Sequence, residues 1–190
     1  MRCFGDGDEL LGRYHDEEWG RPITDEQGLF ERLCLEGMQS GLSWTLILNR
    51  RETLRRAFAQ FDPDAVARFG EGDVERLLGD PGVIRHRGKI EAVIANARAT
   101  LALREQTPLH ELIWSHRPAA RPPIETFEGL ETPREAAALA KELKRAGFRF
   151  VGPTTVYSTM EAAGLVNDHL AGCHVWSEVE QAQRSVASPS

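Results

Sequence analysis

The stretch D-E-Q-G-L-F-E-R-L-C-L-E-G at residues 25–37 decides the fold class, because its apolar side chains recur with the period of an α-helix. Leu29 and Leu33 lie one turn apart, and Glu36 follows on the same face. Cys34 lies among the leucines, where its expected role is that of a small buried hydrophobic residue. The segment therefore predicts an amphipathic helix with a carboxylate on its apolar face.

The same period recurs outward from this segment, and each recurrence predicts a further helix. The expected helices cover residues 43–58, a short segment from Pro63, and residues 72–79, 88–105, 109–115, about 133–145 and 153–163, the last of the chain. Ser43 is a typical N-cap, and Gly147 is typical of a helix end. No strand pair or repeat is evident. The sequence therefore predicts an all-α fold, with one helical domain over residues 1–176 and a flexible tail over 177–190.

The chain of 190 residues and 21.2 kDa is long enough for one domain with a real core. Apolar residues make up 41% and charged residues 27%, a balance that excludes a disordered protein. No apolar run approaches the roughly 18 residues of a membrane span, and the first residues lack the apolar stretch of a secretory signal. We therefore expect a cytoplasmic protein without membrane contact. Its three cysteines are then thiols or metal ligands instead of disulfides.

The net charge of −6 is unusual for a protein that binds nucleic acid, but it is unevenly distributed. Residues 1–40 carry 10 acidic and 4 basic side chains, which accounts for the whole excess. Basic side chains gather in residues 50–56 and 85–104, and phosphate binding requires a local stripe of this kind and not a basic total. Charge alone leaves two interpretations, a phosphate-binding surface or ordinary solvated helix faces, and the second is simpler.

Cysteine and histidine pairs lie near both ends of the chain, with Cys3 and His15 at one end and His169 and Cys173 at the other. Two thiolates and two imidazoles fill the four positions of tetrahedral zinc and leave none open, which is typical of a structural site. One zinc ion bound there would tie the N-terminal segment to the C-terminal one. His174 could replace either imidazole, and two unrelated pairs could arise by chance, so spacing alone leaves the site open.

A carboxylate and several aromatic side chains form a second candidate site. Burial of Glu36 on an apolar face carries a desolvation cost that perturbs the pKa of the carboxyl group, unless this last-turn residue reaches water. The aromatic residues expected around it are Tyr14, which is adjacent to the proposed ligand His15, Trp19, and Trp44, which follows the glycine break. Aromatic faces and one carboxylate suit a flat, cationic, hydrogen-bonding ligand such as an alkylated purine. Taken singly, each aromatic residue is explained as well by core packing.

The string D-P-G-V-I-R-H-R-G-K-I at residues 80–90 predicts a helix end, a tight basic turn and the start of a long helix. Free N–H groups at a helix start bind phosphate oxygens, as in the helix-hairpin-helix motif that grips one DNA strand. Ile84 stands where that motif usually has its second glycine, so the string alone is weak evidence. The residues expected to contact DNA here are Arg85, Arg87, Gly88 and Lys89.

Five strings follow one another along the chain, Y-H-D-E-E-W-G at 14–20, L-C-L-E-G-M-Q-S-G-L-S-W at 33–44, G-V-I-R-H-R-G-K-I at 82–90, G-F-R-F-V-G at 147–152 and G-L-V-N-D-H at 164–169. Together they resemble the bacterial 3-methyladenine DNA glycosylases of the constitutive type (type I), in the helix-hairpin-helix glycosylase superfamily. The resemblance runs from Cys3 to about Cys173, nearly the whole chain.

The resemblance implies a helix-hairpin-helix glycosylase fold whose termini are joined by a structural zinc. The implied metal ligands are Cys3, His15, His169 and Cys173. The implied base pocket consists of Tyr14, Trp19, Glu36 and Trp44, with Glu36 on the purine edge as the catalytic residue and Trp44 stacked on the base. Gly41 and Leu42 match the loop that contacts DNA at the lesion, with Leu42 as a wedge.

The same resemblance implies a reaction, in which a monofunctional enzyme acts on double-stranded DNA with alkylated bases and releases free 3-methyladenine. No aspartate lies between Asp80 and Asp168, where related enzymes place one that assists water. A purine methylated at N3 is already cationic, so it can leave without being protonated. Glu36 is then expected to stabilise the extruded base more than it activates water, while Lys89 contacts phosphate. A monomer is expected.

Two positions depart from the family pattern. Leu11 stands where the family commonly has a further pocket tyrosine, which could loosen base binding. Met38 replaces a polar residue in the turn after Glu36, which could alter contact with the partner strand. Two rival functions stay open from the residues alone. One is a zinc-dependent nucleotide hydrolase, which needs an open metal position, and the other is a non-enzymatic helix-hairpin-helix module that binds DNA.

Overall fold

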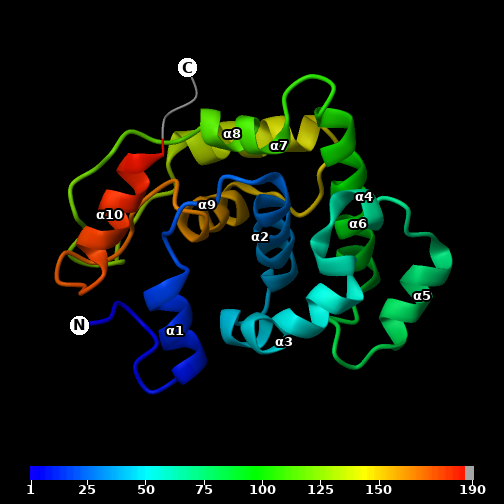
Figure 1. Ribbon diagram of the computed structural model, residues 1–190, viewed down its shortest axis with the longest axis horizontal. Coiled ribbons are helices and arrows are strands. Elements are labelled where there is room, and N and C mark those ends of the chain that lie inside the picture. The colour runs from blue at the N-terminus through cyan, green and yellow to red at the C-terminus, as the bar shows by residue number, and fades with distance from the viewer. Residues whose placement is uncertain (187–190) are drawn as a thin grey trace.

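The computed structural model describes residues 1–186, and helices carry almost all of its regular structure (Figure 1). The elements are α1 (Glu9–Glu17), α2 (Glu26–Gln39), α3 (Trp44–Ala57), the 3-10 turn η1 (Ala59–Phe61), α4 (Pro63–Val66), α5 (Glu71–Gly79), α6 (Arg87–Leu103), α7 (Leu109–Ser115), α8 (Arg134–Arg145), α9 (Pro153–Ala162) and α10 (Trp176–Ser185). Within this range no strand forms, and the sole β-bridge joins Ile124 to Leu170. The all-α prediction is confirmed.

Polar side chains at the helix starts fix where the helices begin. Asp25 accepts a hydrogen bond from the N–H of Gly28 at the start of α2, and Ser43 accepts one from Leu46 at the start of α3, as the sequence predicts. His86 accepts from the N–H of Lys89, so α6 begins one residue earlier than the predicted opening at Gly88. None of the helices in the described range is long and apolar enough to cross a lipid bilayer.

Helix α2 forms the centre of the core, as Figure 1 shows, and packs against α3, α6, α7 and α9. Its leucines at 29, 33 and 35 are at most 1% exposed, and Cys34 is buried among them as predicted. Burial of these apolar side chains stabilises the fold through the hydrophobic effect. The core therefore holds the end of α2, where Glu36 lies, in one fixed place.

Two helices near the termini, α1 and α10, lie outside the predicted set of helices. The nine-residue α1 is capped by Asp8, and α10 covers most of the segment predicted as a flexible tail. In α10, Val179 is fully buried, and the Gln183 amide donates to the carbonyl oxygens of Gly20 and Val166, both at 2.8 Å. The tail prediction is therefore wrong for residues 177–186, and residues 187–190 lie outside the described range.

Helices α8 and α9 pack against each other and are joined by a turn at residues 146–152. Gly147, with φ +98°, ends α8 as predicted, and Phe150 has φ +56°. The Asn96 side chain holds the turn, since its Oδ1 accepts from the N–H of Arg149 at 2.7 Å and its Nδ2 donates to the carbonyl oxygen of Arg149 at 3.2 Å. One buried amide thus fixes the backbone of this turn relative to α6.

Candidate functional site

A cavity of about 320 Å³ lies where α1, α2, α3 and α9 meet. It is lined by all four side chains predicted for the base pocket, Tyr14, Trp19, Glu36 and Trp44. The other lining residues are Phe4, Leu11, Gln39, Thr45, Phe127, Ser158 and Glu161. The volume lies within the range of small-molecule sites, roughly 300–1,000 Å³. Residues separated by more than 140 positions in sequence therefore form one chamber.

Five of the eleven residues that line the chamber are aromatic. The ring centroids of Tyr14 and Trp44 are 5.3 Å apart at an interplanar angle of 51°, and those of Phe4 and Trp19 are 4.9 Å apart at 72°. The centroid of the Phe127 ring, from the segment between α7 and α8, lies 6.3 Å from that of Trp19. These edge and tilted contacts stabilise the rings and leave ring faces for a ligand. Sequence analysis missed Phe4 and Phe127, because no local pattern links them to the pocket.

Glu36 is the buried acid of the chamber. Its side chain lies on α2, and the residue is 6% exposed, so it does not reach bulk water as the alternative interpretation required. Burial raises the pKa of Glu36 to about 7, against the opposing effect of the Arg32 guanidinium one turn earlier. The carboxyl group is therefore poised to exchange between its charged and neutral forms near neutral pH.

Glu18 connects the elements that surround the chamber. Its carboxylate accepts from Arg51 on α3 at 2.5 and 2.8 Å, and from Arg32 on α2 at 3.2 Å. Arg32 in turn lies over the Tyr14 ring, 5.5 Å from its centroid. The segment after α1 is thereby tied to both neighbouring helices. Glu18 belongs to the quoted string at 14–20, but its charge alone gave no indication of these partners.

A second carboxyl group, Glu161 on α9, lines the same chamber and was missed by sequence analysis. Burial raises its pKa well above the usual value, and the neighbouring Asp168 carboxylate adds to the effect. The Asp168 side chain is fully buried and accepts hydrogen bonds from Tyr157 and Arg121. The chamber therefore has an acid on α2 and another on α9, in different charge environments.

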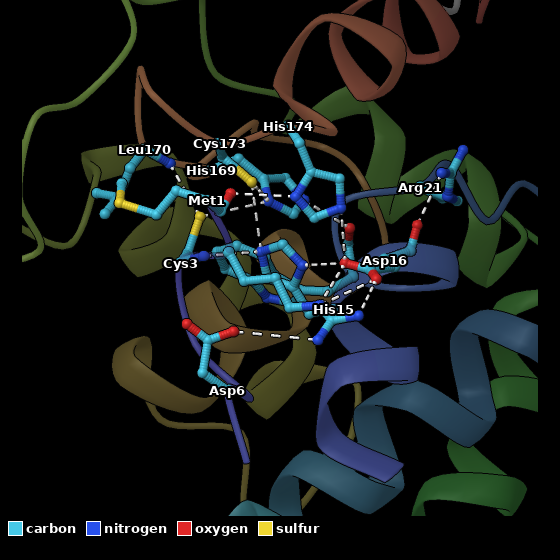
Figure 2. A network of polar contacts seen from close by, with 12 residues as sticks. Met1, Cys3, Asp6, His15, Asp16, Arg21, His169, Leu170, Cys173 and His174 are labelled. Atoms are coloured by element: carbon cyan, nitrogen blue, oxygen red, sulfur yellow. Dashed lines mark hydrogen bonds and ion pairs between the residues drawn. The ribbon is translucent and has the colours of Figure 1, made fainter. Parts of the chain in front are cut away.

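The four predicted metal ligands converge at the junction of the two termini (Figure 2), with ligand atoms all within 4.8 Å of one another. The Sγ of Cys173 lies 3.4 Å from Nε2 of His15 and 3.5 Å from Nδ1 of His169. The Sγ of Cys3 lies 3.6 Å from the same Nδ1 atom. Tetrahedral zinc, with its usual bond lengths, places adjacent sulfur and nitrogen ligands roughly 3.6 Å apart. The donor set and its spacing therefore fit such an ion.

Second-layer contacts orient these ligands for metal binding. Nδ1 of His15 is 2.8 Å from Oδ1 of Asp16, and Nε2 of His169 is 3.0 Å from the carbonyl oxygen of Trp19. Each imidazole thus holds one nitrogen on a neighbour and directs the other at the cluster. Burial lowers the pKa of His169 to about 4, so its ring is neutral, which is the form that binds metals.

His174 does not join the cluster, contrary to the possibility left open by the sequence. Its Nδ1 lies 3.1 Å from the carbonyl oxygen of Met1, and its Nε2 lies 3.1 Å from Oδ1 of Asp16 (Figure 2). The side chain is 46% exposed, whereas His15 and His169 are fully buried. His174 therefore supports Asp16 from outside and leaves the four-ligand set unchanged.

In the hairpin at residues 80–90, which was predicted to bind DNA, two of the basic side chains contact groups of the protein itself. Lys89 is 7% exposed, and its Nζ donates to the carbonyl oxygens of Met38 at 2.8 Å and Ser40 at 2.6 Å. The Lys89 amine is therefore engaged with the protein backbone, and its contact with phosphate stays a prediction. Arg87 is paired with Glu71 and Glu75, while Arg85 is exposed at the turn, next to the half-buried Gly88.

Three arginines of the basic cluster predicted at residues 50–56 are also engaged internally, whereas Arg56 is exposed. Arg50 donates to the carbonyl oxygen of Val83 at 2.9 Å, Arg51 binds Glu18, and Arg55 binds Glu31 at 2.8 Å. These guanidinium groups hold helices together and do not form a free phosphate-binding stripe. The arginines are close together as predicted, but their spacing in the sequence does not reveal whether they pair with protein groups or face solvent.

Replacing Lys89 by methionine is expected to lower the free energy of unfolding by about 1–3 kcal/mol, because two backbone carbonyls lose a charged donor. Urea unfolding measures this change. The matched control Arg85→Met, at an exposed position, is expected to stay within about 0.5 kcal/mol of the wild type. Unchanged stability of the Lys89 variant, together with weaker DNA binding, would restore the phosphate-contact interpretation.

The turn after α2 leads from the buried acid to the surface. Gly41 is exposed with φ +77°, and Leu42 is half-buried against the core. Met38 is 1% exposed, so its side chain fills the core and does not lie where a partner strand could touch it, contrary to the expectation. Leu11, the other departure from the family pattern, lines the chamber as expected.

Comparisons with known proteins agree with this geometry. The family model for methyladenine glycosylase matches residues 4–176. DNA-3-methyladenine glycosylase 1 of Escherichia coli (strain K12) is 50% identical over 170 residues, which cover 87% of this chain and 91% of that protein.

Solved structures agree as well. A crystal structure of 3-methyladenine DNA glycosylase I (TAG) has a TM-score of 0.88 and 47% identity, covering 92% of this chain and 98% of that one. A variant of 3-methyladenine DNA glycosylase I (TAG) in complex with 3-methyladenine has a TM-score of 0.84 and 35% identity, covering 91% and 96%. The family match, the identity and the shared fold lead to one conclusion: the chain belongs to the methyladenine glycosylase family.

Proposed function

We propose that this methyladenine glycosylase removes 3-methyladenine from alkylated double-stranded DNA by hydrolysing the bond between N9 of the base and the deoxyribose. The observation that carries the proposal is the convergence of Tyr14, Trp19, Glu36 and Trp44 on one chamber. This step begins base-excision repair and releases the free base as product. The similar TAG variant in complex with 3-methyladenine supports the choice of base. We expect the chain to act as a monomer.

The chamber suits a cationic purine. Each aromatic face attracts positive charge by roughly 0.5–2 kcal/mol, and Trp44 is the ring that stacks on the base. Glu36 accepts a hydrogen bond from the exocyclic amine and interacts favourably with the charge of the N3-methylated ring. The second acid, Glu161, adds polar lining on the α9 side. An unmodified adenine lacks the positive charge and gains less from these groups.

Base departure needs no added proton, because N3-methylation already makes the purine a good leaving group. The base must leave the stack to enter the chamber, which costs a few kcal/mol and least for a damaged base. Asp168 is held by Arg121 and Tyr157, so its carboxylate is engaged and does not activate water. Recognition and electrostatic support by Glu36 therefore carry most of the catalytic effect.

The DNA-binding face is proposed to include the turn at Gly41 and Leu42, with Leu42 as a wedge, and the exposed Arg85 beside Gly88. Lys89 and Arg87 act from behind this face through the contacts described above. The start of α9 adds a helix N-terminus without a side-chain cap, which suits a phosphate oxygen. The α8–α9 pair therefore resembles a helix-hairpin-helix more closely than the hairpin predicted at residues 80–90.

One structural zinc ion is proposed at Cys3, His15, His169 and Cys173. The donor set and the second-layer contacts support this metal, and it would supply folding energy by joining the termini. Four protein ligands leave no position for a reactive water, which argues against the rival zinc-dependent nucleotide hydrolase.

Incubation of the purified protein with methylated duplex DNA is expected to release 3-methyladenine, identified by chromatography of the free bases. The non-enzymatic rival predicts DNA binding without release, and this outcome would overturn the proposed activity. Borohydride treatment during the reaction is expected to trap no covalent adduct, because the Lys89 amine is buried against two carbonyl oxygens. A trapped adduct would show a bifunctional enzyme.

A further inference from the structure

Phe150, in the turn between α8 and α9, combines two features that cost free energy. Its backbone has φ +56°, a left-handed conformation that a bulky side chain rarely adopts. Its large apolar side chain is 36% exposed. Within the described range, the other exposed large apolar residues are the terminal Met1 and Phe127, which lines the chamber. Strained residues of this kind concentrate at functional sites.

The surrounding turn forces the Phe150 side chain outward. Phe148 and Val151 are 3% and 1% exposed and anchor the turn in the core. The Asn96 amide grips Arg149 on both its N–H and its carbonyl oxygen. With its neighbours fixed inward, the Phe150 ring has a defined and partly solvent-facing position.

Phe150 lies between the two elements already assigned to the DNA-binding face. A Cβ atom built on Gly37 of α2 would lie 3.4 Å from Cβ of Phe150, close to the turn that carries Gly41. The Phe150 ring centroid is 6.4 Å from that of His86, the N-cap of α6. The adjacent Arg149 side chain is 48% exposed and lies 3.8 Å from the Glu91 carboxylate, so it supplies a partly paired positive charge beside the ring. The surface formed by Arg149 and Phe150 therefore adjoins the proposed DNA-binding face, and the Arg149 guanidinium gives it a positive group.

We propose that Phe150 is a DNA-contacting residue, whose ring packs on a sugar or base of the damaged duplex between the lesion turn and the α6 hairpin. The inference rests on the proposed function and extends it to a residue outside the chamber. Aromatic rings provide sequence-tolerant stacking for nucleotides, and a guanidinium beside the ring can neutralise a phosphate. The left-handed backbone is then the cost of presenting the ring.

A pair of variants separates the ring from the backbone. Phe150→Ala removes the ring and keeps a Cβ in the left-handed conformation, whereas Phe150→Gly removes the ring and relieves the conformation. Affinity for a duplex with a tetrahydrofuran abasic analogue is expected to fall about tenfold in both variants. Affinity for free 3-methyladenine is expected to stay within twofold of the wild type. Urea unfolding should show that the glycine variant is the more stable of the two.

Phe127→Ala provides the opposite pattern, since that ring lines the chamber: free-base affinity should fall more than affinity for the abasic duplex. The proposal is overturned if both Phe150 variants bind the duplex like the wild type. It is also overturned if the glycine variant alone recovers binding, because the turn conformation and not the ring would then matter. Failure of the wild type to excise or bind 3-methyladenine would instead count against the proposed function.

Discussion

Replacing Cys173 by serine is expected to abolish stoichiometric zinc binding and to cost on the order of 5 kcal/mol of folding stability. Structural zinc sites in small peptides contribute about 10–16 kcal/mol of gross binding energy, part of which offsets ligand ordering. Total stability of a domain is only about 5–15 kcal/mol, so the variant should be close to unfolded. Metal analysis and urea unfolding, with and without a chelator, measure both effects.

Cys34→Ser is the matched control for this experiment. Cys34 is as buried as Cys173 but lies in the main core, away from the cluster. It should lose some stability through burial of a hydroxyl group, yet retain one zinc per chain. Full zinc content or unchanged chelator sensitivity in the Cys173 variant would contradict the proposed metal site.

Replacing Glu36 by glutamine is expected to weaken both free-base binding and excision, by roughly 10- to 100-fold, because a hydrogen bond to a charged group is worth about 1.5–3 kcal/mol. The variant keeps the shape of the side chain and removes only its charge. Calorimetry with 3-methyladenine and single-turnover excision measure the two losses. A large loss of turnover with intact base affinity would assign Glu36 a purely chemical role.

The pH dependence provides a second readout for Glu36. Its carboxyl pKa of about 7 means that the charged form declines as the pH falls below that value. For the wild type, kcat/KM on alkylated DNA should therefore fall about tenfold per pH unit well below pH 7, whereas the glutamine variant should lack this dependence. Because the folded-state pKa is raised by burial, ionisation destabilises the fold as the pH rises. Glu36→Gln should accordingly be more stable than the wild type at pH 8.

The sequence predicted those parts of the molecule that local patterns determine. The leucine period at residues 25–37 gave α2, and the predicted helix at 109–115 coincides with α7. The convergence of Tyr14 and Glu36 on one chamber followed from the resemblance and not from any spacing. A family motif carries three-dimensional information that periodicity does not contain.

The failures share a physical cause, which is pairing between distant backbone and side-chain groups. Gln183 holds α10 through carbonyl oxygens of Gly20 and Val166, although the helix looks polar and weak by itself. Lys89 appeared to be a surface cation, but its acceptors, at Met38 and Ser40, lie about fifty residues earlier in the chain. Local composition cannot reveal such partners.

The chamber depends on contacts between segments that lie far apart along the chain. The segment that supplies Tyr14 and Trp19 is synthesised more than 140 residues before His169, Cys173 and the helix that follows them, yet it is held by them. A nascent polypeptide can collapse its leucine-rich interior early but must wait for its final portion to close the chamber. Chains that stop before His169 should therefore be inert instead of partly functional.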